Sequence, residues 1–182
     1  IYGLFGTLDM RCITISLLGG TINTAALILA LILTVVGFGF KCSLVPFHMW
    51  TPDVYEGAPT PVAAFLSVGP KAMGFALLLR VFVLNFFPFL LDWILLASLI
   101  SILTMTIGNI SALGQTNIKR LLAFSSIAQA GYILIGLVVA TKNGMEASLF
   151  YLCVYMLMNL GAFAAVIAAS NTLESEEIAD YA

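Results

Sequence analysis

Two lysines lie within long apolar runs, and they are the side chains best placed to do chemistry. Lys41 follows GFGF and precedes CSLVPF, and Lys71 lies in FLSVGPKAMGFALLL. A lysine at the centre of a membrane helix costs at least about 2.5–3.5 kcal/mol unless it faces water, a partner or the protein interior. In low-dielectric surroundings a lysine can switch between its protonated and neutral forms when a neighbouring charge changes. The two lysines are therefore candidate sites of proton transfer.

A simpler interpretation is that the long lysine stems let the ammonium groups reach the lipid headgroups. Lys71 lies about 10 residues into its predicted span, which at about 1.5 Å per residue places it near the bilayer midplane. Lys41 lies nearer the end of its apolar run. Snorkelling therefore stays open for Lys41 and fits Arg80, which is close to the end of the same run as Lys71.

Helix breakers lie beside both lysines. Pro46 follows Lys41 by five residues, and Pro70 directly precedes Lys71. Proline removes one helical hydrogen bond and clashes with the carbonyl four residues back. Secondary transporters place broken helices beside ionisable groups to form ion sites near the bilayer midplane, although membrane helices also contain ordinary proline kinks. We expect helix breaks at Pro46 and Pro70.

The link that follows the first apolar run carries the densest group of ionisable residues, in VPFHMWTPDVYEGAPTPVAAF. His48 titrates near neutrality and can pass protons between water and Lys41. The two residues share one face only if the helix continues through Pro46. His48 is equally well interpreted as a structural hydrogen-bonding residue at the membrane edge. Asp53 and Glu56 either line an entrance or cap the next helix.

A second basic group opens a later apolar run, at TNIKRLLAFSSIAQAGY. Lys119 and Arg120 are typical of a helix end in the headgroup layer, but Lys119 is also a candidate for the proton path. The run continues with a polar face that includes Ser126. Small and hydroxylated residues of this kind either hold helices together or bind water along a path.

The composition indicates whether water or lipid surrounds this chain. Hydrophobic residues make up 62% of it and charged residues 9%, with a mean hydropathy of +1.10, whereas a soluble domain has roughly 25% charged residues. A net charge of −2 gives no basic field for nucleic acid. The three cysteines form no CxxC pair or Cys/His cluster, so no metal site or disulfide framework is predicted. The lipid bilayer is the expected surrounding.

Five segments are apolar and long enough to span a bilayer as helices, and too long for barrel strands. They are residues 23–50, 61–87, 89–113, 120–140 and 145–169. Residues 1–22 are expected to hold the end of a preceding helix and an interfacial loop. Residues 170–182, with Glu174, Glu176, Glu177 and Asp180, are expected to form an acidic loop that leads to a further helix. Trp50 and Tyr55 are predicted to anchor the chain at the membrane interface. The fold class is an all-α polytopic membrane protein with a five-helix portion at 23–169.

Three runs of sequence identify a family resemblance. GFGFKCSLVPFHMWTPDVYEGAPTPVAAFLS, PKAMGF and GNISALGQTNIKRLLAFSSIAQAGYILIG closely resemble the antiporter-like membrane subunits of complex I. Within these the chain looks most like the subunit N group, which includes mitochondrial NADH dehydrogenase subunit 2 and its homologue in the photosynthetic NDH complex. The resemblance covers essentially the whole chain.

The resemblance implies a fourteen-helix fold with two inverted five-helix bundles, of which this chain would form helices 7 to 11. Lys41 matches the family's lysine on a discontinuous helix, and Lys71 matches its connecting lysine on the next. Lys119 matches a basic position in a later link. The family's charged residues on helices 5 and 12 have no counterpart here. The chain is thus expected to be a piece of a longer protein.

The resemblance also implies an activity, which is proton translocation within an NADH:quinone oxidoreductase. NADH, FMN, iron–sulfur clusters and quinone would be bound by other subunits, and this chain would hold no cofactor or redox site. Its partners would be other membrane-arm subunits and the lipid bilayer. The membrane would be a bacterial plasma membrane, a mitochondrial inner membrane or a thylakoid membrane. Two alternatives are the large subunit of a multi-subunit cation/proton antiporter and a helical scaffold that conducts no protons.

Overall fold

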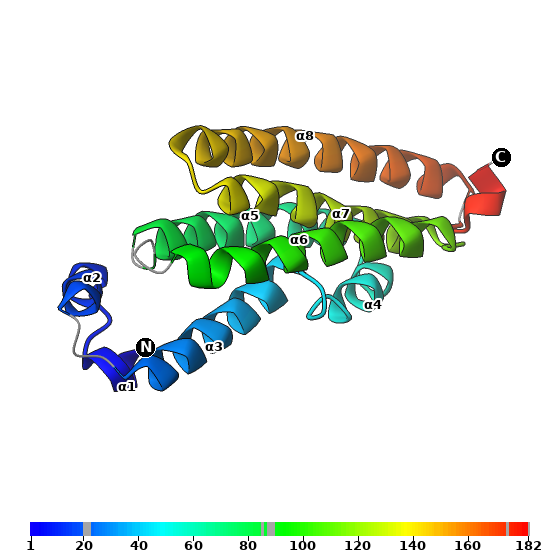
Figure 1. Ribbon diagram of the computed structural model, residues 1–182. Helices are drawn as coiled ribbons and strands as arrows, with labels where there is room; N and C mark the ends of the chain where they lie inside the picture. The colour runs from blue at the N-terminus through cyan, green and yellow to red at the C-terminus, as the bar shows by residue number, and fades with distance from the viewer. Residues whose placement is uncertain (20–22, 85, 87–89, 174, 182) are drawn as a thin grey trace.

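The computed structural model describes residues 1–19, 23–84, 86, 90–173 and 175–181 (Figure 1). Glu174, one of the four predicted acidic residues of the C-terminal loop, lies outside the described residues, as do the predicted span boundaries at residues 87 and 89. The described residues are almost entirely helical. The helices are α1 (Tyr2–Phe5), α2 (Met10–Leu18), α3 (Thr24–Cys42), α4 (Trp50–Gly57), α5 (Thr60–Leu84), α6 (Leu90–Leu113), α7 (Ile118–Val139), α8 (Lys142–Leu173) and the 3₁₀ helix η2 (Ile178–Tyr181).

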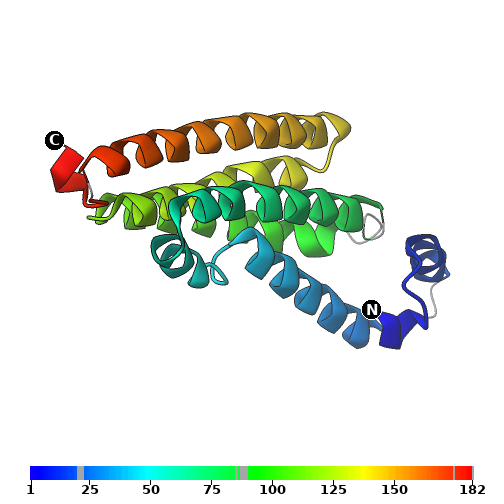
Figure 2. The same cartoon turned by 180° about the vertical axis from the view of Figure 1, so that it is seen from behind.

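Four long helices, α5 to α8, lie side by side, and α3 runs at an angle to them (Figures 1 and 2). Helix α7 packs against α6, α8, α4 and α5, so it forms the centre of the arrangement. It is also the most buried of the five spans. The side chains that α7 presents are therefore those best shielded from lipid in this chain.

Within the part of the chain that the structure describes, five helices are long and apolar enough to cross a membrane, which confirms the predicted fold class. They are α3, the Thr60–Val83 part of α5, the Trp93–Leu113 part of α6, α7 and α8. Helix α8 is longer than predicted at both ends. Residues 1–18 form the short helices α1 and α2, and Ile13 and Leu17 of α2 are buried. The protein is an integral membrane protein.

The first membrane helix is shorter than the predicted span at residues 23–50, because α3 ends at Cys42. Ser43 adopts a left-handed conformation, with a φ of 60°, and its amide donates to the carbonyl of Phe40 at 3.2 Å. The amide of Leu44 donates to the carbonyl of Gly39 at 2.8 Å, which closes the C-terminal cap. Pro46 lies in the break that follows, at residues 43–49, before α4 begins. Hydropathy alone could not place this break, because residues 44–47 are as apolar as the helix.

The break expected at Pro70 is absent, since α5 continues through this residue from Thr60 to Leu84. The missing amide of Pro70 leaves the carbonyl of Leu66 without its usual helical donor. Membrane helices tolerate such a loss where neighbouring groups pack around it. Pro70 is thus an internal proline of a continuous helix.

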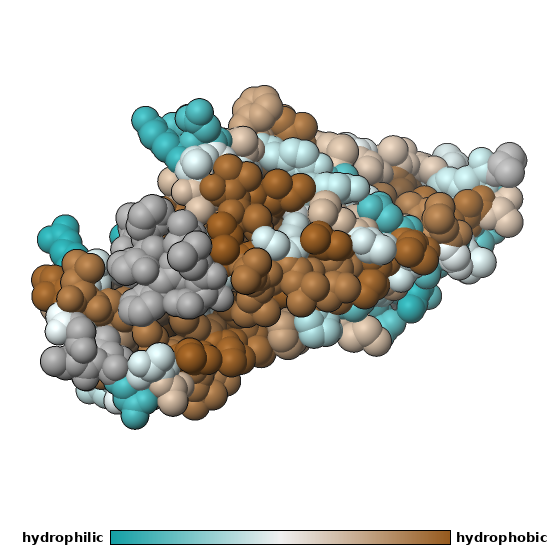
Figure 3. Space-filling view, in the orientation of Figure 1, coloured by the Kyte–Doolittle hydropathy of each residue, from teal (hydrophilic) through white to brown (hydrophobic). Residues whose placement is uncertain are grey.

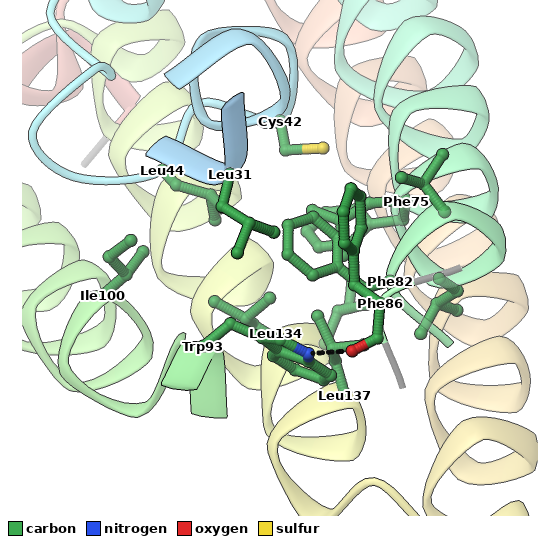
Figure 4. Packing of buried hydrophobic residues seen from close by; sticks show 14 of the residues in the cluster. Leu31, Cys42, Leu44, Phe75, Phe82, Phe86, Trp93, Ile100, Leu134 and Leu137 are labelled. Atoms are coloured by element: carbon green, nitrogen blue, oxygen red, sulfur yellow. Dashed lines mark hydrogen bonds between the residues drawn. The ribbon is translucent and has the colours of Figure 1, made fainter. Parts of the chain in front are cut away.

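The larger cluster of buried apolar residues joins side chains of α3, α5, α6 and α7 (Figure 4). Phe82, Phe86 and Trp93 pack together, with the rings of Phe82 and Trp93 5.2 Å apart in an edge-to-face arrangement. The indole nitrogen of Trp93 donates to the carbonyl of Phe86 at 2.9 Å. Leu31 and Leu44 come from α3 and the break, so this core joins the angled helix to the others. Its dispersion contacts take the place of the lipid contacts that these faces would otherwise make.

Glycines let α6 and α7 approach closely. A Cβ on Gly108 would lie 2.7 Å from the amide nitrogen of Ala128, and one on Gly131 would lie 2.6 Å from Cγ of Met105. Close backbone approach at small residues is a common basis of helix association in membranes. The approach fixes the rotation of α7, and with it the direction of its polar side chains.

The surface bears out the membrane assignment. Apolar residues cover most of the face seen in Figure 3, and hydrophilic residues gather mainly towards the ends of the long helices. Large apolar side chains on α3, α6 and α8 are exposed, among them Leu29, Leu95 and Leu157. A water-soluble protein rarely exposes contiguous apolar area on this scale.

Gly108→Ala should lower the stability of the purified protein in detergent by about 1–3 kcal/mol, because the new methyl group meets the backbone of α7. The measurement is the Tm of thermal unfolding. Gly161→Ala is the matched control, since nothing lies within 4 Å of a Cβ at Gly161. An equal Tm for the two variants would contradict the close α6–α7 contact.

Candidate functional site

Lys71 is buried where α5 meets α7, and its side chain is only 2% exposed. Its ammonium donates to the carbonyl of Ser126 at 3.1 Å and to the hydroxyl of the same serine. The ring of Tyr55, from α4, lies over it with 5.9 Å between Nζ and the ring centroid, within the range of a cation–π contact. The snorkelling interpretation is therefore wrong for Lys71 in this structure.

The ammonium of Lys71 lies well inside the span. Ser126 is eight residues after Ile118, the first residue of α7, which corresponds to roughly 12 Å along the helix axis. Ser126 is itself 1% exposed. The site is thus shielded from both lipid and the helix end.

Neutral groups supply every contact described for this ammonium. No carboxylate among the described side chains lies within 4.0 Å of Lys71. A buried ion pair fixes the charge of its members, because removing one charge leaves the other unpaired. Hydroxyl and carbonyl acceptors carry no net charge, so they do not fix the charge of the lysine in this way. Lys71 is consequently in surroundings that can accommodate both its protonated and its neutral form.

A polar network continues from Ser126 into α8. The Ser126 hydroxyl lies 2.7 Å from the Tyr155 hydroxyl, which in turn donates to the carbonyl of Ser67 at 3.0 Å. Asn159 donates to the hydroxyls of Ser67 and Tyr155, the latter at 3.3 Å. All four residues are at most 4% exposed. The network therefore links α5, α7 and α8 around Lys71.

Sequence reasoning missed Tyr155 and Asn159. Single polar residues in an apolar span are common, and neither residue is ionised at neutral pH. The available signal is their spacing of four residues, which places both on one face of α8. A tyrosine and an asparagine on the same face of an otherwise apolar span indicate a shared polar partner.

Lys41 is placed differently from Lys71. It lies in the last turn of α3, is exposed, and lines a groove with Met73 and Gly74 of α5. A Cβ on Gly74 would lie 2.8 Å from the Cys42 sulfur and 3.3 Å from Cγ of Lys41, so this glycine allows α3 to approach α5 one turn beyond Lys71. The two lysines thus lie on neighbouring helices, with Cys42 directly after Lys41 at the end of α3.

His48 lies in the break after α3 and is 8% exposed. Because α3 ends at Cys42, the shared helical face expected for Lys41 and His48 does not form. The His48 Nδ1 atom is buried without a hydrogen-bond partner of ordinary geometry in the described part of the chain. Burial lowers the pKa of His48, although the carbonyl of Pro46 opposes the shift.

Lys119 lies at the start of α7 and is 4% exposed. Its ammonium forms an ion pair with Glu176 at 2.8 Å and donates to the carbonyl of Ala58 at 3.1 Å. Ser126, which contacts Lys71, is seven residues further along α7, roughly 10 Å along its axis. Lys119 therefore holds the C-terminal segment and the α4–α5 link at the end of α7.

Asp53 and Glu56 both contact Arg120. One guanidinium nitrogen of Arg120 lies 2.8 Å from Asp53 and 2.6 Å from Glu56. The side chain of Asn117 caps α7 by accepting from the amides of Lys119 and Arg120. These ion pairs join α4 to the first turn of α7.

The expectation that Trp50 and Tyr55 anchor the chain at the interface is wrong for Tyr55, which is fully buried beside Lys71. Trp50 stacks on Phe40, with 5.4 Å between the ring centroids, and donates to its carbonyl at 3.1 Å. Both aromatics hold α4 against its neighbours. Sequence alone gives no sign of this, because α4 begins at the end of the first apolar run and falls mostly in the link that follows it.

Among the described residues there is no group of three or more His, Cys, Asp or Glu side chains that could hold a metal ion. Cys12, Cys42 and Cys153 are free. The side chains around Lys71 thus carry hydroxyl, phenol and amide groups, which donate and accept hydrogen bonds.

The whole chain, residues 1–182, matches the family described as "NADH:quinone oxidoreductase/Mrp antiporter, TM". The chain belongs to this family. A relative from Prochlorococcus marinus, NAD(P)H-quinone oxidoreductase subunit 2, is 52% identical over all of this chain and over 34% of its own length. The chain thus spans about a third of the curated relatives that it matches.

Two solved structures contain the same fold. A chain of respiratory complex I from Thermus thermophilus is 42% identical, with a TM-score of 0.71 over 91% of this chain and 34% of its own. A chain of the Mrp complex from a Dietzia species is 25% identical, with a TM-score of 0.80 over 91% of this chain and 30% of its own. Both are multi-subunit membrane complexes. The sequence identity favours the complex I branch.

Arg120→Gln should loosen α4, because Asp53 and Glu56 would lose their cationic partner. We expect amide hydrogen exchange in residues 50–57 to accelerate by about two- to fivefold, as exposed ion pairs are worth up to about 1 kcal/mol each. Lys142→Gln is the control, since the ion pair of Lys142 among the described residues is an exposed one, with Glu146 at 3.7 Å. Unchanged exchange in α4 of Arg120→Gln would show that the pairs do not hold this helix.

Proposed function

We propose that the chain forms part of a proton-translocating membrane subunit of an NADH:quinone oxidoreductase. The observation that carries the proposal is Lys71, a lysine buried within the span and contacted only by neutral groups among the described side chains. Such a lysine can accept and release a proton without breaking an ion pair. Family membership and 52% identity to a subunit of this class of enzyme support the same function.

Lys71 is the central relay in this proposal, and Lys41 exchanges protons with it across the α3–α5 contact. Gly74 allows the close approach that such exchange needs, with water completing the connection. His48, buried in the break after α3, passes protons between Lys41 and the aqueous side. A neutral imidazole suits this role because one ring nitrogen can accept a proton while the other donates one.

Lys119, Asp53 and Glu56 have a supporting role at the end of the bundle. The ion pairs Lys119–Glu176 and Arg120–Asp53 hold α4 and the C-terminal segment against α7. These ion pairs keep Tyr55 over Lys71. They also surround the end of the bundle at the start of α7, where protons would enter towards the site. We assign Pro46 to the break that allows α4 to turn against α7.

The redox chemistry is assigned to other subunits. NADH, FMN, iron–sulfur clusters and quinone would be bound there, and the energy of quinone reduction would reach this chain through contacts with neighbouring membrane-arm subunits. The two similar solved structures support such an assembly because both are multi-subunit complexes.

A cation/proton antiporter is the second candidate, because the Mrp complex has the same fold. Its 25% identity, against 42% for the Thermus complex I chain, favours the oxidoreductase. A scaffold without proton conduction is disfavoured by the buried lysine, since an apolar residue at this position would be less costly.

Lys71→Ala should reduce the rate of NADH-driven proton translocation by about tenfold or more, because a positioned proton-transfer group contributes roughly 10²–10⁴ in rate. The measurement uses membrane vesicles that contain the assembled complex. Arg80→Ala on the same helix is the control, since Arg80 is exposed. Translocation that is unchanged in Lys71→Ala would rule out the proposed relay. Sodium export by vesicles, independent of NADH, would favour the antiporter.

A further inference from the structure

Helix α8 contributes Tyr155 and Asn159 to the Lys71 site, although neither residue contacts the lysine. Tyr155 is 2% exposed and Asn159 is 4% exposed. Both reach across to α5, where Ser67 lies one turn before Lys71. Buried polar groups of this kind are retained only where hydrogen bonds satisfy them.

The chemistry of the groups fixes the direction of each hydrogen bond in this network. The carbonyl of Ser67 can only accept, so the single proton of the Tyr155 hydroxyl points to it, at 3.0 Å. The Tyr155 oxygen must then accept from the Ser126 hydroxyl, 2.7 Å away. With its own proton used, Ser126 offers a lone pair to the ammonium of Lys71. Asn159 donates to Tyr155 at 3.3 Å and so reinforces this order.

We propose, on the basis of the proposed function, that Tyr155 is a positioning residue for Lys71, which turns the Ser126 hydroxyl so that its lone pair faces the ammonium. A hydroxyl proton that pointed at the lysine would repel the ammonium. Tyr155 prevents this by accepting that proton from Ser126. Asn159 holds Tyr155 in place through the same network.

This branch stabilises the protonated lysine and does not carry its proton onward. A proton passed from Lys71 through Ser126 and Tyr155 would end on the carbonyl of Ser67, which has no proton to release. The proton therefore leaves Lys71 by a route other than this branch. The hydroxyl of Tyr55, whose ring lies over Lys71, is buried without a hydrogen-bond partner of ordinary geometry in the described residues.

Few titratable groups among the described residues face Lys71, so a change in the pH profile of translocation can be assigned to this lysine. They are Cys42 from α3, Tyr55 from α4 and Tyr155 from α8, with Lys41 beyond Cys42. Helix α7 contributes the neutral Ser126, and no described carboxylate contacts the lysine. A change in the pH profile on altering Tyr155 would thus report on Lys71.

The test measures NADH-driven proton translocation by the assembled complex in vesicles as a function of pH. Tyr155→Phe keeps the ring and removes the hydroxyl. The protonated lysine then loses a fixed acceptor, so translocation should fall off at lower pH than in the parent protein, by about one pH unit. Ser126→Ala should give the same shift, and the double variant should add nothing, because both changes remove one interaction.

Tyr132→Phe is the matched control, since Tyr132 is 37% exposed and its hydroxyl accepts from Asn109, away from this network. An unshifted pH profile in Tyr155→Phe would overturn the positioning role, as would an equal loss of rate at every pH. Additive shifts in the double variant would also overturn it. The proposed function is judged separately, by the loss of translocation in Lys71→Ala.

Discussion

The packing of the helices around α5 depends on the burial of one ammonium group. Lys71 gives up the hydration of a charged group inside a span, and it is contacted by one serine and one aromatic ring. The cost of this desolvation must be offset by polar groups that are held in place, because an acceptor that moves stabilises the ammonium less. Two helices besides α5, namely α4 and α7, therefore have to be held within contact of one side chain.

Close helix packing meets that requirement. The glycines at 108 and 131 bring α6 and α7 together and fix which face of α7 points to α5. At the end of the same helix, ion pairs from Lys119 and Arg120 hold α4 and the C-terminal segment. Neither device acts on Lys71 directly. Both reduce the freedom of the elements that supply its contacts.

Sequence reasoning predicted the features that depend on composition and failed for those that depend on orientation. The five spans follow from apolar length, and the depth of Lys71 follows from counting residues along its span. The end of α3 at Cys42 could not be placed in this way, because a serine in a left-handed conformation within an apolar run does not change the hydropathy profile. The break expected at Pro70 is wrong for a related reason: proline weakens a membrane helix, but packing decides whether the helix ends.

The hydrogen-bond network begins and ends on α5, which supplies Lys71 at one end and the carbonyl of Ser67 at the other. It is thus a closed ring through α7 and α8. A displacement of α8 along α5 would stretch the Tyr155–Ser67 bond and release the serine hydroxyl from its fixed orientation. The position of α8 and the proton affinity of Lys71 are then thermodynamically linked. A shift of α8 changes the proton affinity of the lysine, and protonation of the lysine changes the preferred position of α8 by the same free energy. Two hydroxyl-bearing side chains and one backbone carbonyl are enough to provide this coupling.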